Sequence, residues 1–199
     1  MIKAILFDMD GVLIDSHDAW FHIFNKAYKK FEKKQITVEE FDKKVWAKAF
    51  DKLAKKYFHI PVKEIRAYYR KIYDEYEKRL KVIDGTKEAL SSLKDIDLAV
   101  VSNTQRNVIE RVLKDVDLYN FFDLFLGGDD VEHGKPEPDI LHKALELLKL
   151  NKDEVIFVGD TIWDRMASKA AGIKFIGFKI KGDISIDNLK ELGNNKLFK

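Results

Sequence analysis

The sequence predicts an α/β fold: a Rossmann-like parallel sheet with helices on both faces, plus an inserted all-α domain. After residue 84, short apolar runs of strand length alternate with amphipathic runs of helix length, and the connections are short. This alternation is typical of a parallel sheet covered on both faces by helices. Residues 15–83 show no convincing strand, and their apolar residues repeat with helical periodicity. We therefore expect a core domain of residues 1–14 and 84–199 and a helical domain of residues 15–83.

The individual elements follow from local patterns. Residues 2–7 predict a buried strand that runs directly into Asp8. In the helical domain, Thr37 followed by Glu40 predicts a capping box, and Pro61 suits the first turn of another helix. After residue 84 we expect, in order, a helix at 86–94, a strand at 98–102, a helix from 105, a strand at 124–126, a helix at 136–150, a strand at 155–158, a helix at 161–171 and a strand at 174–177.

The composition excludes several classes of protein. The chain has 199 residues, of which 46% are hydrophobic and 35% charged, as in a folded globular protein. The absence of cysteine excludes disulfides, thiolate zinc sites and a cysteine nucleophile. No apolar run approaches the ~20 residues of a membrane helix, and the N-terminus does not resemble a signal peptide, so we expect a cytoplasmic protein without a membrane partner. Many Lys, Glu and Ile residues without Cys are a pattern typical of a thermophile.

Charge is distributed unevenly along the chain. The net charge of +2 is close to neutral and does not indicate a nucleic-acid partner. Residues 15–83 contain 18 basic and 11 acidic residues, a net charge of +7, whereas the rest of the chain carries −5. This excess reflects either the solvated faces of helices or a surface that attracts an anionic substrate.

Side chains that could carry chemistry follow the first two predicted strands. Asp8 and Asp10 lie two residues apart after the first strand, so their carboxylates point toward the same region and repel each other unless a cation or proton lies between them. Ser102 and Asn103 follow the next strand, where a hydroxyl and backbone N–H groups at a helix start can bind an anion. Each motif alone also has a structural interpretation, as a solvated turn or a helix cap.

Two further motifs follow later strands. Lys135 precedes Pro136, which we expect to fix a helix entry, and this lysine is either a surface residue or one that neutralises a phosphate. Asp160 ends a strand and Asp164 lies one helical turn later, so the two either stabilise the helix start or bind a hard cation such as Mg²⁺. Because ligands of parallel sheets bind at the carboxyl ends of the strands, we expect all four motifs to converge there. Together they supply what phosphoryl transfer through an aspartyl-phosphate requires.

The order and spacing of these motifs resemble those of the haloacid dehalogenase superfamily. Asp8–Val12 is similar to the first motif of that family, Ser102 to the second, Lys135 to the third, and Asp160 with Asp164 to the fourth. The helical domain resembles the cap of the phosphoglycolate phosphatase and β-phosphoglucomutase branch. The resemblance implies a cap that closes over the substrate and selects it.

The resemblance also implies catalytic and phosphate-binding roles. Asp8 is expected to attack phosphorus, and Asp10 to protonate the leaving alcohol and then to deprotonate water. Lys135 is expected to bridge Asp8 and the phosphate. Phosphate oxygens are expected to be bound by Gly11, Ser102, Asn103 and Lys135.

The cofactor implied by the resemblance is Mg²⁺. Its expected ligands are the carboxylates of Asp8 and Asp160 and the backbone carbonyl of Asp10. Asp164 is expected to support either the metal or Lys135.

The function implied is hydrolysis of a small-molecule phosphate ester by a monomer or homodimer. Family dehalogenases lack an aspartate at the position of Asp10 and use no metal, so Asp10 favours phosphatases and sugar-phosphate mutases. A phosphosugar mutase with the same site and a catalytically silent binding protein on this fold stay open as alternatives.

Overall fold

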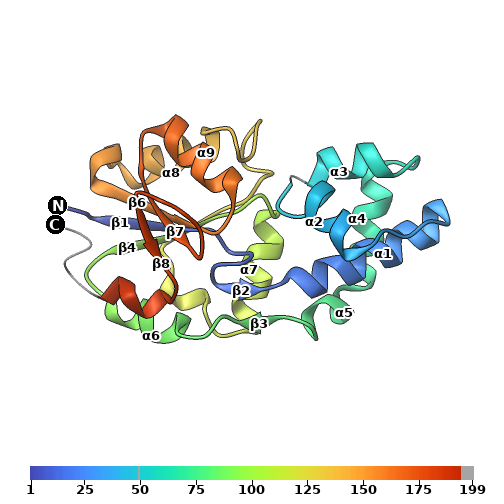
Figure 1. Ribbon diagram of the computed structural model, residues 1–199, viewed down its shortest axis with the longest axis horizontal. Helices are drawn as coiled ribbons and strands as arrows, with labels where there is room; N and C mark the ends of the chain where they lie inside the picture. The colour runs from blue at the N-terminus through green and yellow to red at the C-terminus, as the bar shows by residue number, and fades with distance from the viewer. Residues whose placement is uncertain (49, 194–199) are drawn as a thin grey trace. The chain divides into compact units, whose positions relative to one another are not determined.

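A six-stranded parallel sheet, ordered β5-β4-β1-β6-β7-β8, forms the centre of one part of the protein (Figure 1). β1 lies inside the sheet between β4 and β6, and all of its residues are buried apolar residues, as expected for a strand covered on both faces. This confirms the predicted α/β fold. The strands are β1 (Ala4–Phe7), β4 (Asp97–Val101), β5 (Leu124–Leu126), β6 (Val155–Gly159), β7 (Lys174–Phe178) and β8 (Ile184–Ile186).

Helices cover both faces of this sheet. Figure 1 shows α8 and α9 on one face and α6 and α7 on the other. The helices of this part are α6 (Thr86–Ser92), α7 (Arg106–Asp115), α8 (Asp139–Leu148) and α9 (Ile162–Ala171), with 3₁₀ turns η1 (Tyr119–Phe121), η2 (Lys152–Glu154) and η3 (Leu189–Gly193).

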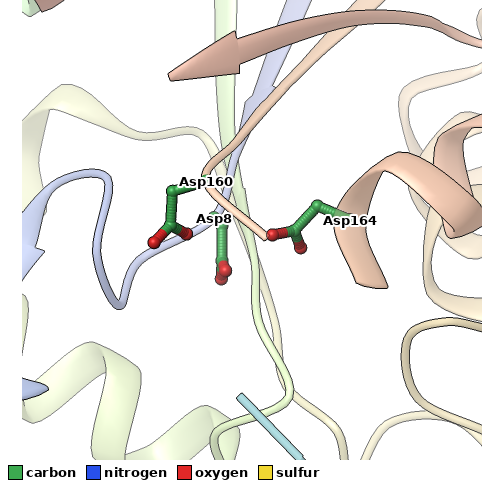
Figure 2. Close-up of side chains that lie close together, drawn as sticks. All are labelled: Asp8, Asp160 and Asp164. Atoms are coloured by element: carbon green, nitrogen blue, oxygen red, sulfur yellow. The ribbon is translucent and has the colours of Figure 1, made fainter. Parts of the chain in front are cut away.

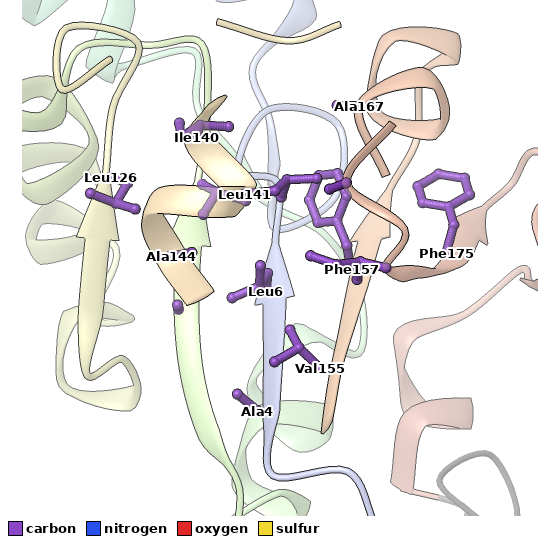
Figure 3. Close-up of a cluster of buried hydrophobic side chains, with 14 residues drawn as sticks. Ala4, Leu6, Leu126, Ile140, Leu141, Ala144, Val155, Phe157, Ala167 and Phe175 are labelled. Atoms are coloured by element: carbon purple, nitrogen blue, oxygen red, sulfur yellow. The ribbon is translucent and has the colours of Figure 1, made fainter. Parts of the chain in front are cut away.

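The core between the sheet and helices α8 and α9 is built from alternate strand residues (Figure 3). Successive residues of a strand point to opposite faces, so Leu6 of β1 faces this core and Phe7 faces away from it. Phe157 of β6 lies in the same cluster and is fully buried, and α8 contributes Ile140 and Leu141. This apolar layer fixes the strands whose ends carry the polar motifs.

The computed structural model describes residues 1–48 and 50–193, and it divides into two units. The first, which we call the body, comprises Met1–Ile14 and Val82–Lys199; the second, the helical unit, comprises Asp15–Lys81. The two linking segments, β2 (Ile14–Asp15) and β3 (Lys81–Val82), pair as a two-stranded sheet. The expectation that residues 15–83 contain no strand was wrong at this point, because two-residue strands are too short to give an alternating pattern.

The helical unit has an aromatic core of its own, which includes Phe24, Phe41 and Phe58. The capping box predicted at Thr37 is present, with Glu40 as its second member. Its helices are α1 (His17–Glu32), α2 (Val38–Lys44), α3 (Phe50–Tyr57), α4 (Val62–Lys71) and α5 (Tyr73–Glu77). Among the described residues, no helix is long and apolar enough to cross a membrane.

One predicted helix start and one missed strand in the body need correction. The helix expected from residue 136 begins only at Asp139, with Pro138 at its N-cap, so Lys135 belongs to an irregular loop. The short strand β8 was not predicted, because its three residues follow a Gly–Asp turn and carry too little periodicity.

We predict that Phe157→Ala lowers the free energy of unfolding of the body by about 3–5 kcal/mol, because it leaves a cavity in a fully buried layer. Denaturant unfolding followed by circular dichroism measures this loss. Leu147→Ala is the matched control, since Leu147 is 51% exposed, and it should cost less than about 1 kcal/mol. Equal losses in the two variants would contradict the assignment of Phe157 to the core.

Candidate active site

Three neighbouring strands bring the polar motifs to one edge of the sheet. Asp8 follows β1, Ser102 follows β4 and Asp160 follows β6, and β4, β1 and β6 are adjacent in the sheet. Figure 2 shows the side chains of Asp8, Asp160 and Asp164 gathered around one region. Each offers a carboxylate oxygen, and these oxygens all lie within 4.8 Å of one another. The structure thus brings together the first and fourth motifs.

Lys135 lies against two of these carboxylates. Its Nζ is 2.9 Å from Asp8 Oδ1 and 2.6 Å from Asp164 Oδ1, and its side chain is almost completely buried. Burial alone would lower the pKa of Lys135, but the carboxylates of Asp164 and Asp8 outweigh it and raise the pKa above its ordinary value. The ammonium group therefore stays charged and offsets part of the buried negative charge.

A side-chain contact across two loops holds Lys135 in place. Asn103 Nδ2 donates a hydrogen bond to the backbone carbonyl of Lys135 at 3.0 Å. A Cβ atom at Gly134 would lie 2.4 Å from Asn103 Oδ1, so this close approach needs glycine. The side-chain amide of Asn103 thus contacts the lysine loop, and phosphate binding by Asn103 stays a prediction.

Both oxygens of Asp164 are engaged by protein groups. Oδ2 accepts hydrogen bonds from the backbone N–H of Thr161 at 3.0 Å and from its hydroxyl at 2.5 Å, while Oδ1 faces Lys135. Thr161 and Asp164 form a capping box that begins α9. Asp164 is therefore placed to anchor Lys135, which is one of the two roles expected for it.

Asp8 uses one oxygen for its contacts with the protein. Oδ1 accepts the backbone N–H of Met9 at 2.8 Å and faces Lys135, and Oδ2 takes part in neither contact. Burial raises the pKa of Asp8, the Lys135 ammonium opposes this shift, and the neighbouring carboxylates add to it.

Asp160 is the least compensated carboxylate of the group. Its Oδ1 is enclosed and has no hydrogen-bond partner. Burial raises its pKa to about 8, and repulsion from Asp8 and Asp164 contributes. Gly11, with φ +88°, approaches this carboxylate so closely that a Cβ atom would lie 2.1 Å from Asp160 Oδ2. The structure gives Gly11 this packing role, and its predicted role in phosphate binding stays a prediction.

This arrangement fits a hard divalent cation. Three carboxylates face one ammonium group, so the cluster has an excess of negative charge in a poorly solvated place. Carboxylate oxygens are the ligands that Mg²⁺ prefers, and the unpartnered Oδ1 of Asp160 is an oxygen that a cation would satisfy.

The side chain of Asp10 lies outside this three-carboxylate cluster and contacts the second motif. Its Oδ2 accepts hydrogen bonds from Thr104 Oγ1 at 2.8 Å and from Ser102 Oγ at 3.4 Å. Thr104 lies in the same Ser102-Asn103-Thr104 segment as the second motif, but the sequence predicts no role for it. Its position two residues after Ser102, in a turn that begins a helix, was the one signal that could have found it.

Comparisons with known proteins identify the family of the chain. The family model described as haloacid dehalogenase-like hydrolase matches residues 5–178. The chain is 34% identical over 180 residues to the phosphoglycolate phosphatase of Aquifex aeolicus, with 87% of this chain and 83% of that protein covered. It is 31% identical over 191 residues to the pyrophosphatase PpaX of Halalkalibacterium halodurans, with 92% and 86% covered.

A solved structure extends the likeness to the fold. CbbY from Rhodobacter sphaeroides in complex with xylulose-(1,5)bisphosphate superposes with a TM-score of 0.83 at 22% identity, and 97% of each chain is covered. Because the family model covers most of the chain and relatives share about a third of its residues, the chain belongs to the haloacid dehalogenase-like hydrolases, in the branch that includes phosphoglycolate phosphatase.

Proposed function

We propose that this chain is a Mg²⁺-dependent phosphatase that hydrolyses a small-molecule phosphate ester through an aspartyl-phosphate on Asp8. The observation that carries the proposal is the buried Lys135 ammonium placed between Asp8 and Asp164, beside Asp160. Such a site binds a dianionic phosphate next to a carboxylate only if cations balance the charge, and the lysine supplies one of them.

Asp8 is the proposed nucleophile. Its carboxylate oxygen attacks phosphorus, a new P–O bond forms, and the bond from phosphorus to the ester oxygen breaks. Because Met9 N–H and Lys135 both contact Oδ1, they hold the carboxylate in one orientation and Oδ2 is the oxygen suited to attack. Lys135 also reaches the charge that develops on the phosphoryl oxygens.

Asp10 is the proposed acid and base. In the first step it donates a proton to the leaving alcohol, which leaves poorly as an alkoxide. In the second step its carboxylate takes a proton from water, whose oxygen attacks phosphorus and breaks the bond to Asp8. The sum of the steps is ester plus water giving alcohol plus phosphate, with Asp8 and Asp10 restored.

Asp8, Asp160 and the backbone carbonyl of Asp10 are the groups we propose to hold Mg²⁺. When bound, Mg²⁺ supplies positive charge that stabilises the transferring phosphoryl group. Ser102 follows β4 at the same edge of the sheet, and its hydroxyl is the group we propose to bind phosphate oxygens. The raised pKa of Asp160 agrees with a carboxylate whose compensating charge is not part of the protein.

The helical unit is the proposed cap. Its excess of basic residues suits an anionic substrate, and its own aromatic core allows it to keep its structure as a separate body. The names of the relatives suggest phosphoglycolate and pyrophosphate as first substrates to test.

The direct test is a panel of pyrophosphate, 2-phosphoglycolate, sugar phosphates and p-nitrophenyl phosphate, each with Mg²⁺ and with EDTA. We expect Mg²⁺-dependent release of inorganic phosphate. Isomerisation of a sugar phosphate without phosphate release would assign the chain to the mutases. Halide release from 2-haloacids without Mg²⁺ would overturn the proposal.

We predict that Asp8→Asn reduces p-nitrophenyl phosphate turnover by at least about 10³-fold, because an amide cannot attack phosphorus. Steady-state assays with circular dichroism as a folding check measure this. Asp95→Asn makes the same chemical change at an exposed residue of the body and should leave the rate unchanged. A rate for Asp8→Asn within tenfold of wild type would refute the assignment of the nucleophile.

A second prediction concerns Mg²⁺ binding, which is measured through the thermal stability of the protein. Mg²⁺ should raise the thermal midpoint of the wild-type protein at pH 8 by on the order of a few °C, because a ligand that binds the folded state stabilises it. Asp160→Asn should lose most of this increase, since it removes a proposed ligand, whereas Asp95→Asn should retain it. Differential scanning calorimetry measures both, and an undiminished shift in Asp160→Asn would contradict the site.

The same variants give a pH dependence in the absence of metal. The pKa of Asp160 rises from an ordinary 3.8 to about 8 on folding, so the folded state keeps a proton that the unfolded state has released. The free energy of unfolding of the wild-type protein, relative to that of Asp160→Asn, should therefore be highest below about pH 4. It should decrease as the pH rises toward 8. A pH-independent difference in unfolding free energy between the two proteins would exclude this ionisation.

A further inference from the structure

Two hydroxyl groups converge on one oxygen of Asp10. Thr104 Oγ1 lies 2.8 Å and Ser102 Oγ 3.4 Å from Asp10 Oδ2. Hydroxyl hydrogen bonds to oxygen have an ordinary length of about 2.7–2.8 Å, so the Thr104 contact has this length and the Ser102 contact is much longer. Thr104 therefore makes the stronger of the two contacts with the carboxyl group.

The backbone of Thr104 is held on both sides. Its N–H donates to Ser102 Oγ at 3.1 Å, and its carbonyl accepts the N–H of Gly128 at 2.9 Å. The packing there is tight, because a Cβ atom at Gly127 would lie 2.7 Å from the Thr104 carbonyl oxygen. The threonine hydroxyl is thus presented to Asp10 from a fixed backbone.

Ser102 cannot hold Asp10 while it binds phosphate. A hydroxyl has one proton to donate, and the proposed function assigns that proton to a phosphate oxygen. The longer contact of Ser102 with Asp10 is the one that substrate would replace. Thr104 has no such assignment, so phosphate binding does not require its hydrogen bond to Oδ2 to break.

We propose that Thr104 is a positioning residue that fixes the orientation of the Asp10 carboxyl group by donating a hydrogen bond to Oδ2. The carboxyl group held in this way is the one that exchanges a proton with the leaving alcohol and then with water. The inference rests on the proposed function of Asp10 as acid and base. The role of Thr104 is to keep the Asp10 carboxyl group close to the leaving oxygen.

The test compares two leaving groups in single-turnover formation of the aspartyl-phosphate. Thr104→Val keeps the size of the side chain and removes the hydroxyl. We expect it to slow the reaction by about 10- to 100-fold with the best alkyl phosphate of the panel, because a misplaced acid is costly when the leaving group needs its proton. With p-nitrophenyl phosphate, whose leaving group needs little protonation, the loss should be below about threefold. KM for the two substrates should change little.

Thr104→Ser is the matched control. It restores the hydroxyl and should recover the alkyl phosphate rate to within about threefold of wild type. Equal losses with the aryl and the alkyl ester, or no recovery in Thr104→Ser, would show that Thr104 supports the fold only. Circular dichroism and a crystal structure of Thr104→Val, in which we expect the Asp10 carboxyl group to rotate, complete the comparison.

Asp10→Asn separates this inference from the proposed function. If Asp10→Asn loses no more activity with the alkyl ester than with the aryl ester, the acid role of Asp10 fails, and the role of Thr104 fails with it. If Asp10→Asn shows the selective loss and Thr104→Val does not, only the positioning role is overturned. In the double variant, Thr104→Val should add less than about twofold to the loss caused by Asp10→Asn, because both changes act through one group.

Discussion

The contact of one buried ammonium group with two buried carboxylates is the constraint on which the polar edge of this sheet depends. Lys135 lies within 3 Å of both Asp8 and Asp164. An unpaired buried charge is costly, so without this cation the carboxylates could lie together at the strand ends only by taking up protons. Neighbouring residues hold both sides of this contact in place. Thr161 donates two hydrogen bonds to Asp164 Oδ2, and Asn103 donates one to the backbone carbonyl of Lys135. The remaining negative charge is what makes the site suitable for a divalent cation.

Much of the fold and part of the site could be predicted from the sequence, because their causes are local. A buried parallel strand must be apolar throughout, and β1 and β6 are. Polar residues that directly follow parallel strands lie at one edge of the sheet whatever the strand order. The sequence therefore predicts that Asp8 and Asp160 share this edge, although it does not reveal which strands are neighbours. The capping box at Thr37 depends only on two residues that lie three positions apart, so it could also be predicted from the sequence.

What could not be predicted depends on contacts between distant segments. Lys135 lies nine residues beyond the end of β5, in a loop whose path is set by the hydrogen bond from Asn103. No local pattern reveals that an amide 32 residues away holds this loop. Likewise, the contact of Thr104 with Asp10 joins residues 94 positions apart. Local patterns therefore predict the charged residues of the site better than neutral residues such as Asn103 and Thr104. The contacts of these neutral residues join distant segments and become visible only in the folded structure.

The paired linkers β2 and β3 have a consequence for how such proteins can diversify. The chain leaves the body at Ile14 and returns at Val82, and these two points are held side by side, with Ile83 N–H bonded to the Leu13 carbonyl. An insertion between adjacent points imposes little loop-closure entropy on the rest of the chain, whatever its length. The segment between them is thus an exchangeable module. Recombination could replace it with a shorter loop or an unrelated domain without altering the register of the sheet or the strand ends that hold Asp8, Ser102 and Asp160.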